Sequence, residues 1–157
     1  WGSKVKGLVM YEPPIDPERS SESYQSDHRD MAALAAENRG EDMIVNFLFD
    51  IMPPEVFEGF RNSPSWPSFA AVGLTIEHDY RVLADARATD DPPARWQSVT
   101  APVLILDGDA SFPFMRAGAD WVASGLPNAT RRTLAGQSHD YDPVIVGQEV
   151  LAFFAKR

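Results

Sequence analysis

The chain has 157 residues, of which 44% are hydrophobic and 24% are charged, and this composition predicts a globular domain rather than a disordered segment. Its formal net charge of −9 disfavours nucleic acids and anionic membrane surfaces as partners, because like charges repel. The absence of cysteine excludes disulfides, thiolate metal sites and a cysteine nucleophile, and it fits a cytoplasmic location.

No membrane span or leader is predicted from the sequence. No apolar run approaches the roughly 18 residues that a membrane-spanning helix needs. Lys4 and Lys6 precede only the short apolar run 7–11, so we expect no signal peptide. The chain starts with Trp1-Gly-Ser rather than Met, which leads us to expect a processed, truncated or recombinant product.

The first predicted element is a short apolar strand over residues 6–12, which two prolines end at positions 13 and 14. We expect this strand to be buried, with Glu12 at its C-terminal end. Residues 13–21 are rich in Pro, Asp and Ser and predict a loop.

A helical pattern follows, and it predicts one helix that ends at Gly40 and others over residues 41–51, from Pro53, and over 68–86. A linker is expected at 90–93. The large apolar side chains of this segment are expected to be mostly core, although they could instead roof a substrate pocket. They are Met31, Phe47, Phe49, Met52, Phe57, Phe60, Trp66 and Phe69.

The rest of the chain alternates strands with helices. The pattern predicts strands over 103–106 and 130–134 and helices over 114–124 and 143–155. Apolar strands separated by helices imply a parallel sheet covered on both faces, so the fold class is α/β. Three strands are few for such a sheet. We therefore expect the first strand to have a bare edge that pairs with another chain, by dimerisation, swapping or complementation.

His139 is the first candidate catalytic residue, because it follows the third strand within the polar turn Gly-Gln-Ser-His-Asp. Functional groups of open α/β sheets gather beyond the carboxyl ends of the strands. An imidazole at such a place can relay a proton near neutral pH. The alternative is a loop histidine that only caps or hydrogen-bonds.

Two acids are candidates for orienting this histidine. Asp109 belongs to the Asp-Gly-Asp turn that ends the strand at 103–106, where it could instead serve only the turn, and Asp107 could cap the same turn. Glu12 ends the first strand and is the rival acid, with a solvated carboxylate as its alternative. Ser138 nearly matches a nucleophile elbow, but Asp140 is not small and Pro143 delays the helix, so we do not expect it to be the nucleophile. No metal-ligand spacing and no phosphate-binding glycine loop is found, so no metal or cofactor is expected.

In order and spacing these segments resemble the C-terminal portion of the α/β-hydrolase family. The phrases Tyr-Glu-Pro-Pro at 11–14, Trp-Pro at 66–67 and Leu-Pro-Asn-Ala at 126–129 are similar to those of small, capped, bacterial-type hydrolases. The resemblance matches residues 5–12 to the sixth strand, 13–93 to a helical cap, 103–109 to the seventh strand with its acid turn, and 130–139 to the eighth strand with the histidine loop.

The chain also departs from this family. The elbow serine, the first five strands and the oxyanion-hole loop have no counterpart in it. The family's acid usually stands three residues after the turn glycine, which is Ser111 when counted from Gly108. Asp109 would therefore serve from a shifted place, or Glu12 from the end of the sixth strand.

The resemblance implies a partial α/β-hydrolase fold of about three parallel strands. Residues 1–12 and 94–157 would form the C-terminal part of its core, and 13–93 a cap insertion with flanking linkers. It implies a serine hydrolase of small ester-like or similar acyl substrates, with His139 as general base and Asp109 or Glu12 as the acid. This chain alone would be inactive, and its partner would be the missing N-terminal half or another copy at the first-strand edge.

Two other hypotheses stay open at this point. The chain could be a non-catalytic binding or interaction module that has kept the back half of the fold. It could also be a small α/β domain whose likeness to a hydrolase is superficial.

Overall fold

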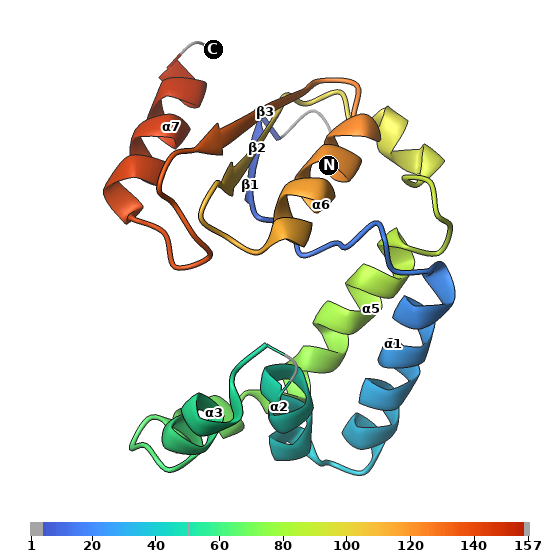
Figure 1. The fold of residues 1–157 in the computed structure, drawn as a ribbon. Coiled ribbons are helices and arrows are strands. Elements are labelled where there is room, and N and C mark those ends of the chain that lie inside the picture. The colour runs from blue at the N-terminus through green and yellow to red at the C-terminus, as the bar shows by residue number, and fades with distance from the viewer. Residues whose placement is uncertain (1–4, 50, 156–157) are drawn as a thin grey trace. The chain divides into compact units, whose positions relative to one another are not determined.

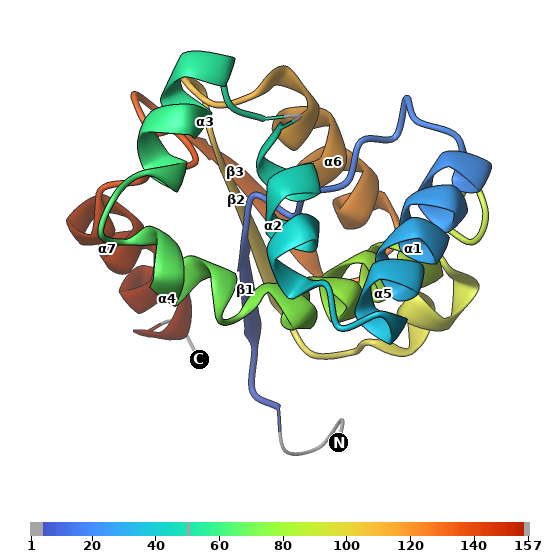
Figure 2. The ribbon, with the colours of Figure 1, turned by 90° about the horizontal axis from the view of Figure 1, so that it is seen from below.

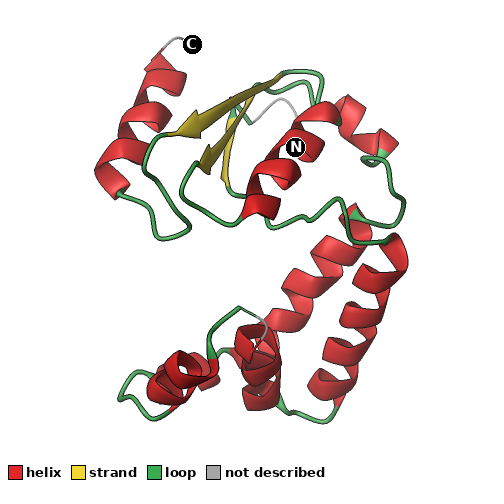
Figure 3. Ribbon diagram, viewed as in Figure 1, coloured by secondary structure: helices red, strands yellow, loops and turns green. Residues whose placement is uncertain are grey.

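The structure is a computed structural model, and it describes residues 5–49 and 51–155. The chain divides into two compact units (Figures 1 and 3). Unit 1 comprises Trp1–Ser20 and Thr89–Arg157, and unit 2 comprises Ser21–Ala88. Unit 1 contains the sheet, and unit 2 contains only helices among its described residues.

Unit 1 is built on one parallel sheet with the strand order β1-β2-β3. The strands are β1 (Leu8–Tyr11), β2 (Val103–Gly108) and β3 (Ala129–Leu134). Leu8 pairs with Val103 at the start of the sheet. Gly108 pairs with Leu134 at its carboxyl end. The predicted α/β class and the three parallel strands are confirmed.

The central strand β2 is buried along its whole length. Successive side chains of a strand point to opposite faces, and Leu104 and Leu106 pack with Phe153 of α7 (Pro143–Ala155). The opposite face is covered by α6 (Pro113–Ser124), and Figure 1 shows the two helices on either side of the sheet. This double cover explains why β2 is an unbroken apolar run.

Strand β1 is less buried than the sequence predicts, since Leu8 at its start is 41% exposed. Among the described residues β1 pairs only with β2. The N–H groups of Leu8 and Glu12 donate to the carbonyls of Pro102 and Leu106 of that neighbouring segment. N–H groups of a parallel strand alternate in direction, so those of Val9 and Tyr11 face the other edge. The expected bare edge of β1 is therefore present, and it explains the exposure of Leu8.

Unit 2 contains five α-helices and one 3₁₀ helix in the part of it that is described. They are α1 (Ser21–Ala36), α2 (Gly40–Phe49), α3 (Pro54–Arg61), α4 (Trp66–Ala70), η2 (Gly73–Thr75) and α5 (Ile76–Ala86). Figure 2 shows α1 and α5 side by side. A second 3₁₀ helix, η3 (Ala94–Ser98), belongs to unit 1.

The single helix predicted over 68–86 is wrong, because the chain there forms α4, η2 and α5 in succession. The break lies at Gly73, where the backbone touches α2 so closely that a Cβ atom would lie 2.0 Å from the carbonyl oxygen of Gly40. A continuous helix cannot make this approach with an ordinary side chain. Glycine is therefore required at position 73 because of the contact with Gly40, and not because of the conformation of η2.

The core of unit 2 contains only part of the expected apolar set. Met31, Phe57 and Trp66 are buried, whereas Phe47, Phe49 and Phe69 are exposed. Trp66 also donates from Nε1 to Glu41 at 3.0 Å. Over the described residues, no helix of either unit has the length and apolar character that crossing a bilayer requires.

Candidate active site

The candidate site lies at the carboxyl ends of β1 and β2, within unit 1. Glu12 directly follows β1, Asp109 directly follows β2, and His139 lies in the loop between β3 and α7. The parallel register brings these ends to the same edge of the sheet. Residues that are distant in sequence therefore meet there, as expected for an open α/β sheet.

Glu12 is a buried carboxylate, only 1% exposed, that accepts three hydrogen bonds. The Gly108 N–H donates to Oε1 at 3.0 Å. The Ser111 hydroxyl donates to Oε2 at 2.8 Å, and His139 Nδ1 lies 2.9 Å from the same oxygen. These donors compensate the loss of water around the buried group.

The backbone at Glu12 has φ = +45°, in the left-handed region that residues other than glycine rarely adopt. Such a conformation costs about 1–3 kcal/mol and persists only where the surroundings hold it. Here the Glu12 N–H still donates to Leu106 at 2.8 Å, while the side chain is held by its three donors. Strain of this kind is concentrated at functional sites.

His139 is held at one nitrogen and free at the other. Because a carboxylate oxygen only accepts, Nδ1 carries the hydrogen that is shared with Glu12. Nε2 makes no hydrogen bond to any described residue, and the His139 side chain is 62% exposed. This arrangement leaves the basic lone pair of Nε2 available for proton transfer.

Asp109 makes no hydrogen bond or ion pair with His139. Its Oδ1 atom accepts a hydrogen bond of 2.6 Å from the Gly136 N–H, and Gly136 has φ = +68°. The Asp109 backbone N–H donates to Leu134 at 3.1 Å. Of the two candidate acids, the structure therefore brings Glu12 to the histidine and brings Asp109 to the start of the histidine loop.

The loop that carries His139 touches the end of β2 at close range. A Cβ atom on Gly108 would lie 2.0 Å from the carbonyl oxygen of Gln137. That carbonyl accepts from the Ala110 N–H at 3.0 Å, and the Gln137 side chain accepts from the Asp142 N–H at 2.8 Å. Glycine is thus required at position 108, because a side chain there would push the histidine loop away from the end of β2.

Tyr11, at the end of β1, also holds this loop, and sequence reasoning missed it. Its hydroxyl donates to the Ser138 carbonyl at 2.6 Å, and its ring lies 4.7 Å, centre to centre, from that of Tyr141. Its position directly before Glu12 was the signal that could have identified it. The Ser138 hydroxyl donates to the carbonyl of Asp140 at 3.1 Å.

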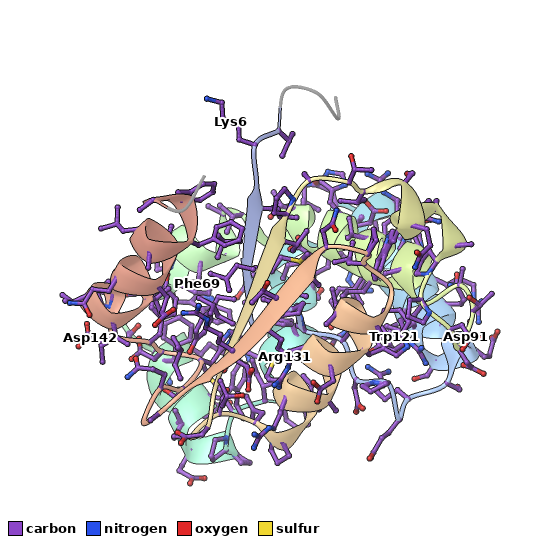
Figure 4. The ribbon with its side chains drawn as sticks, turned by 90° about the horizontal axis from the view of Figure 1, so that it is seen from above. Lys6, Phe69, Asp91, Trp121, Arg131 and Asp142 are labelled. Atoms are coloured by element: carbon purple, nitrogen blue, oxygen red, sulfur yellow. The ribbon has the colours of Figure 1, made fainter. Side chains whose placement is uncertain are left out.

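Asp107 is fully buried on β2 and belongs to a separate cluster. The Thr133 hydroxyl donates to it at 3.1 Å, and Arg131, labelled in Figure 4, lies 3.0 Å from it. Burial raises the pKa of Asp107, while the positive charge of Arg131 and the Thr133 hydrogen bond oppose that rise. The cluster joins β2 to β3. No group of His, Asp and Glu side chains within the described ranges could hold a metal ion.

The comparison with solved structures finds similar chains that include one described as an alpha/beta hydrolase. Over 96% of its length, the chain is 30% identical to an alpha/beta hydrolase from Sphaerobacter thermophilus DSM 20745, with a TM-score of 0.70, and it covers 58% of that protein. MenH from S. aureus shows 19% identity and a TM-score of 0.50 over 97% of this chain and 59% of its own. BpoC from Mycobacterium tuberculosis H37Rv shows 15% identity and a TM-score of 0.51, and the match covers 97% of this chain and 58% of BpoC.

The last two similarities show the fold alone. No protein-family model matches the sequence, and no curated protein matches it. The chain spans less than two thirds of the length of each of these structures. It therefore corresponds to a portion of their fold.

Proposed function

This chain is a C-terminal portion of the α/β-hydrolase fold, and from that premise we propose that it supplies the histidine and the acid of a serine hydrolase site. His139 is the general base and Glu12 is the acid that orients it. The observation that carries the proposal is the 2.9 Å contact between His139 Nδ1 and Glu12 Oε2. Asp109 holds the start of the histidine loop through Gly136.

The chemistry follows from the two nitrogens of His139. A serine hydroxyl outside this chain attacks the acyl carbon of an ester-like substrate, and Nε2 takes its proton. The imidazolium so formed is stabilised by the Glu12 carboxylate at Nδ1. The same proton then passes to the leaving alcohol as the ester bond breaks, which leaves an acyl-serine. His139 next takes a proton from the water that attacks the acyl-serine, and it returns this proton to the serine oxygen as the acid product leaves.

The other parts of the machinery are proposed to lie in an N-terminal portion that pairs with β1. The hydrolase from Sphaerobacter thermophilus is longer than the matched region, and β1 has an open edge on which further strands can add. That portion would supply the serine and the oxyanion donors. Unit 2 is proposed as a cap that limits substrate size. A cytoplasmic location rests on the lack of cysteine.

The proposal is tested with two polypeptides, the 157-residue chain and a longer product that includes any upstream coding sequence. We expect the longer product to hydrolyse p-nitrophenyl esters and to react with a fluorophosphonate at a serine. We expect the 157-residue chain to do neither. His139→Ala should abolish turnover, whereas His78→Ala, a change at an exposed histidine of α5, should not.

A longer product that contains a G-x-S-x-G segment and yet shows no reaction would count against a hydrolase and favour a non-catalytic binding module. Turnover by the 157-residue chain that is lost in His139→Ala would contradict the claim that it is inactive alone. Full turnover by the His139→Ala variant of the longer product would remove His139 from the mechanism.

A further inference from the structure

Tyr11, the last residue of β1, and Glu12, which directly follows it, both hold the histidine loop, although strand geometry places consecutive side chains on opposite faces. Tyr11 donates its hydroxyl to the carbonyl of Ser138, and Glu12 accepts from the ring of His139. The positive φ of Glu12 interrupts the strand geometry at this point. The strained residue thus allows neighbouring side chains to contact the same loop.

The phenol ring of Tyr11 contacts the loop on both sides of His139. The hydrogen bond of 2.6 Å fixes the residue before the histidine, and the ring contact with Tyr141 fixes the second residue after it. The ring itself packs against the cluster that contains Leu104 and Leu106 of β2. A ring held by the sheet is a rigid anchor for the loop, in addition to the hydrogen bonds that Asp109 and Glu12 make with it.

The hydroxyl of Tyr11 remains a donor across the neutral range. Burial, followed by the negative charge of Glu12, raises the pKa of Tyr11 to about 12. The Ser138 carbonyl, which can only accept, therefore keeps its donor at neutral pH.

We propose that Tyr11 is a positioning residue, whose hydroxyl holds the Ser138 carbonyl so that His139 Nδ1 stays within hydrogen-bonding distance of Glu12. This role rests on the proposed function, because it matters for catalysis only if His139 is the base. A purely structural role would be filled by the ring alone, through its packing on the sheet. The substitution Tyr11→Phe separates the two roles, since phenylalanine keeps the ring and lacks the hydroxyl donor.

The test is Tyr11→Phe in the 157-residue chain, with Tyr141→Phe as the matched control, since no hydrogen bond of the Tyr141 hydroxyl is seen among the described residues. Amide hydrogen exchange is followed at Ala110 and Asp142, whose N–H groups bond to Gln137 of the loop. Val103 of β2, whose N–H bonds to the carbonyl of Asn128 directly before β3, is the reference. A second readout is the NMR signal of the His139 Nδ1 proton.

In Tyr11→Phe we expect exchange at Ala110 and Asp142 to become about fivefold faster, because one hydrogen bond less favours loop opening by about that factor. Val103 should not change, and the Nδ1 proton of His139 should exchange faster with water. Tyr141→Phe should leave all four signals as they are.

Unchanged exchange at Ala110 and Asp142 in Tyr11→Phe would overturn the proposal. Equal acceleration at all three amides would also overturn it, since it would assign the hydroxyl to stability of the whole unit. These measurements need no substrate. Failure of the ester and fluorophosphonate assays would thus remove the hydrolase function, and failure of the exchange experiment would remove only the role of Tyr11.

Discussion

His139 Nδ1 lies 2.9 Å from Glu12 Oε2, although 127 residues separate the two in sequence. The contact joins the end of the first strand to the loop after the last one, and it spans the intervening strand β2. A buried acid that faces one nitrogen of an exposed imidazole fixes its tautomer and leaves the other nitrogen reactive. This relationship determines which substitutions should affect the chemistry.

Under the proposed function, Glu12→Gln in a longer product that contains a nucleophilic serine should lower kcat by about 10³- to 10⁴-fold, because an amide no longer stabilises the imidazolium and favours the wrong tautomer. KM should change little, since Glu12 is buried and its carboxylate is occupied by donors of the protein itself. The measurement is steady-state hydrolysis of a p-nitrophenyl ester.

Asp109→Asn is the matched control for that substitution. It keeps an oxygen that can accept from Gly136, and it should lower kcat by less than about tenfold, as expected for one weakened hydrogen bond away from the reacting atoms. A larger loss from Asp109→Asn than from Glu12→Gln would reverse the assignment of the acid.

Ser111 offers a second test, because it stands where the family resemblance places the acid. Its hydroxyl and His139 Nδ1 meet at the same oxygen of Glu12, at 2.8 Å and 2.9 Å. A carboxylate at position 111 is therefore within the neighbourhood of the imidazole. Ser111→Asp, added to Glu12→Gln, should raise kcat at least about tenfold above that of Glu12→Gln alone. Ser111→Asn, added in the same way, should not raise it. Equal rates in the two double variants would show that position 111 cannot serve the histidine.

The sequence was sufficient to predict the sheet and the edge of it at which Glu12, Asp109 and His139 lie. Strand β2 could be predicted because it is covered on both faces, and such strands are unbroken apolar runs. His139 and both acids could be identified because polar residues directly after strands collect at one edge of a parallel sheet. What the pattern could not decide was the choice between Asp109 and Glu12.

That choice depends on backbone geometry that leaves no periodic signal. The left-handed φ of Glu12 and the close approach of Gly108 to Gln137 both arise from contacts between distant segments. The same holds for Tyr11, whose role depends on a carbonyl 127 residues away. The break at Gly73 was missed for this reason too, since its neighbour α2 is remote in sequence.

Gly108→Ala should destabilise unit 1 by about 1–3 kcal/mol, because the new methyl group would lie 2.0 Å from the Gln137 carbonyl oxygen and must displace the loop. Gly147→Ala, at a position in α7 where a Cβ atom meets nothing within 4 Å, is the matched control. It should stabilise by about 0.5–1 kcal/mol. Urea unfolding, followed through amide signals of β2, measures both. Equal stability of the two variants would contradict the close contact.

Unit 2 should lose stability in acid through Glu77. The hydrogen bond from His28 on α1 lowers the pKa of Glu77 on α5, so the unfolded state binds its proton more readily than the folded state does. The stabilisation is complete above the ordinary glutamate pKa of about 4.3 and is lost as the pH falls through the lowered value.

Glu77→Gln should remove this part of the pH dependence. Urea midpoints of the α1 and α5 amide signals, measured at neutral pH and in acid, test the prediction. Glu55→Gln, a change at an exposed glutamate of α3, is the control. The same acid-induced loss in Glu77→Gln and in the unsubstituted chain would rule out the His28–Glu77 contact as its cause.

The open edge of β1 should make the 157-residue chain associate, because the N–H groups of Val9 and Tyr11 have no strand partner on that side among the residues that the structure describes. Val9→Pro removes one of these edge donors and keeps the bond from Leu8 to the neighbouring segment, so it should reduce association in sedimentation velocity. Leu151→Lys, which places a charge on the exposed side of α7, is the control for association through apolar side chains. Association that Leu151→Lys removes and Val9→Pro leaves intact would place the contact on α7, and a monodisperse monomer at all concentrations would show that the edge does not pair.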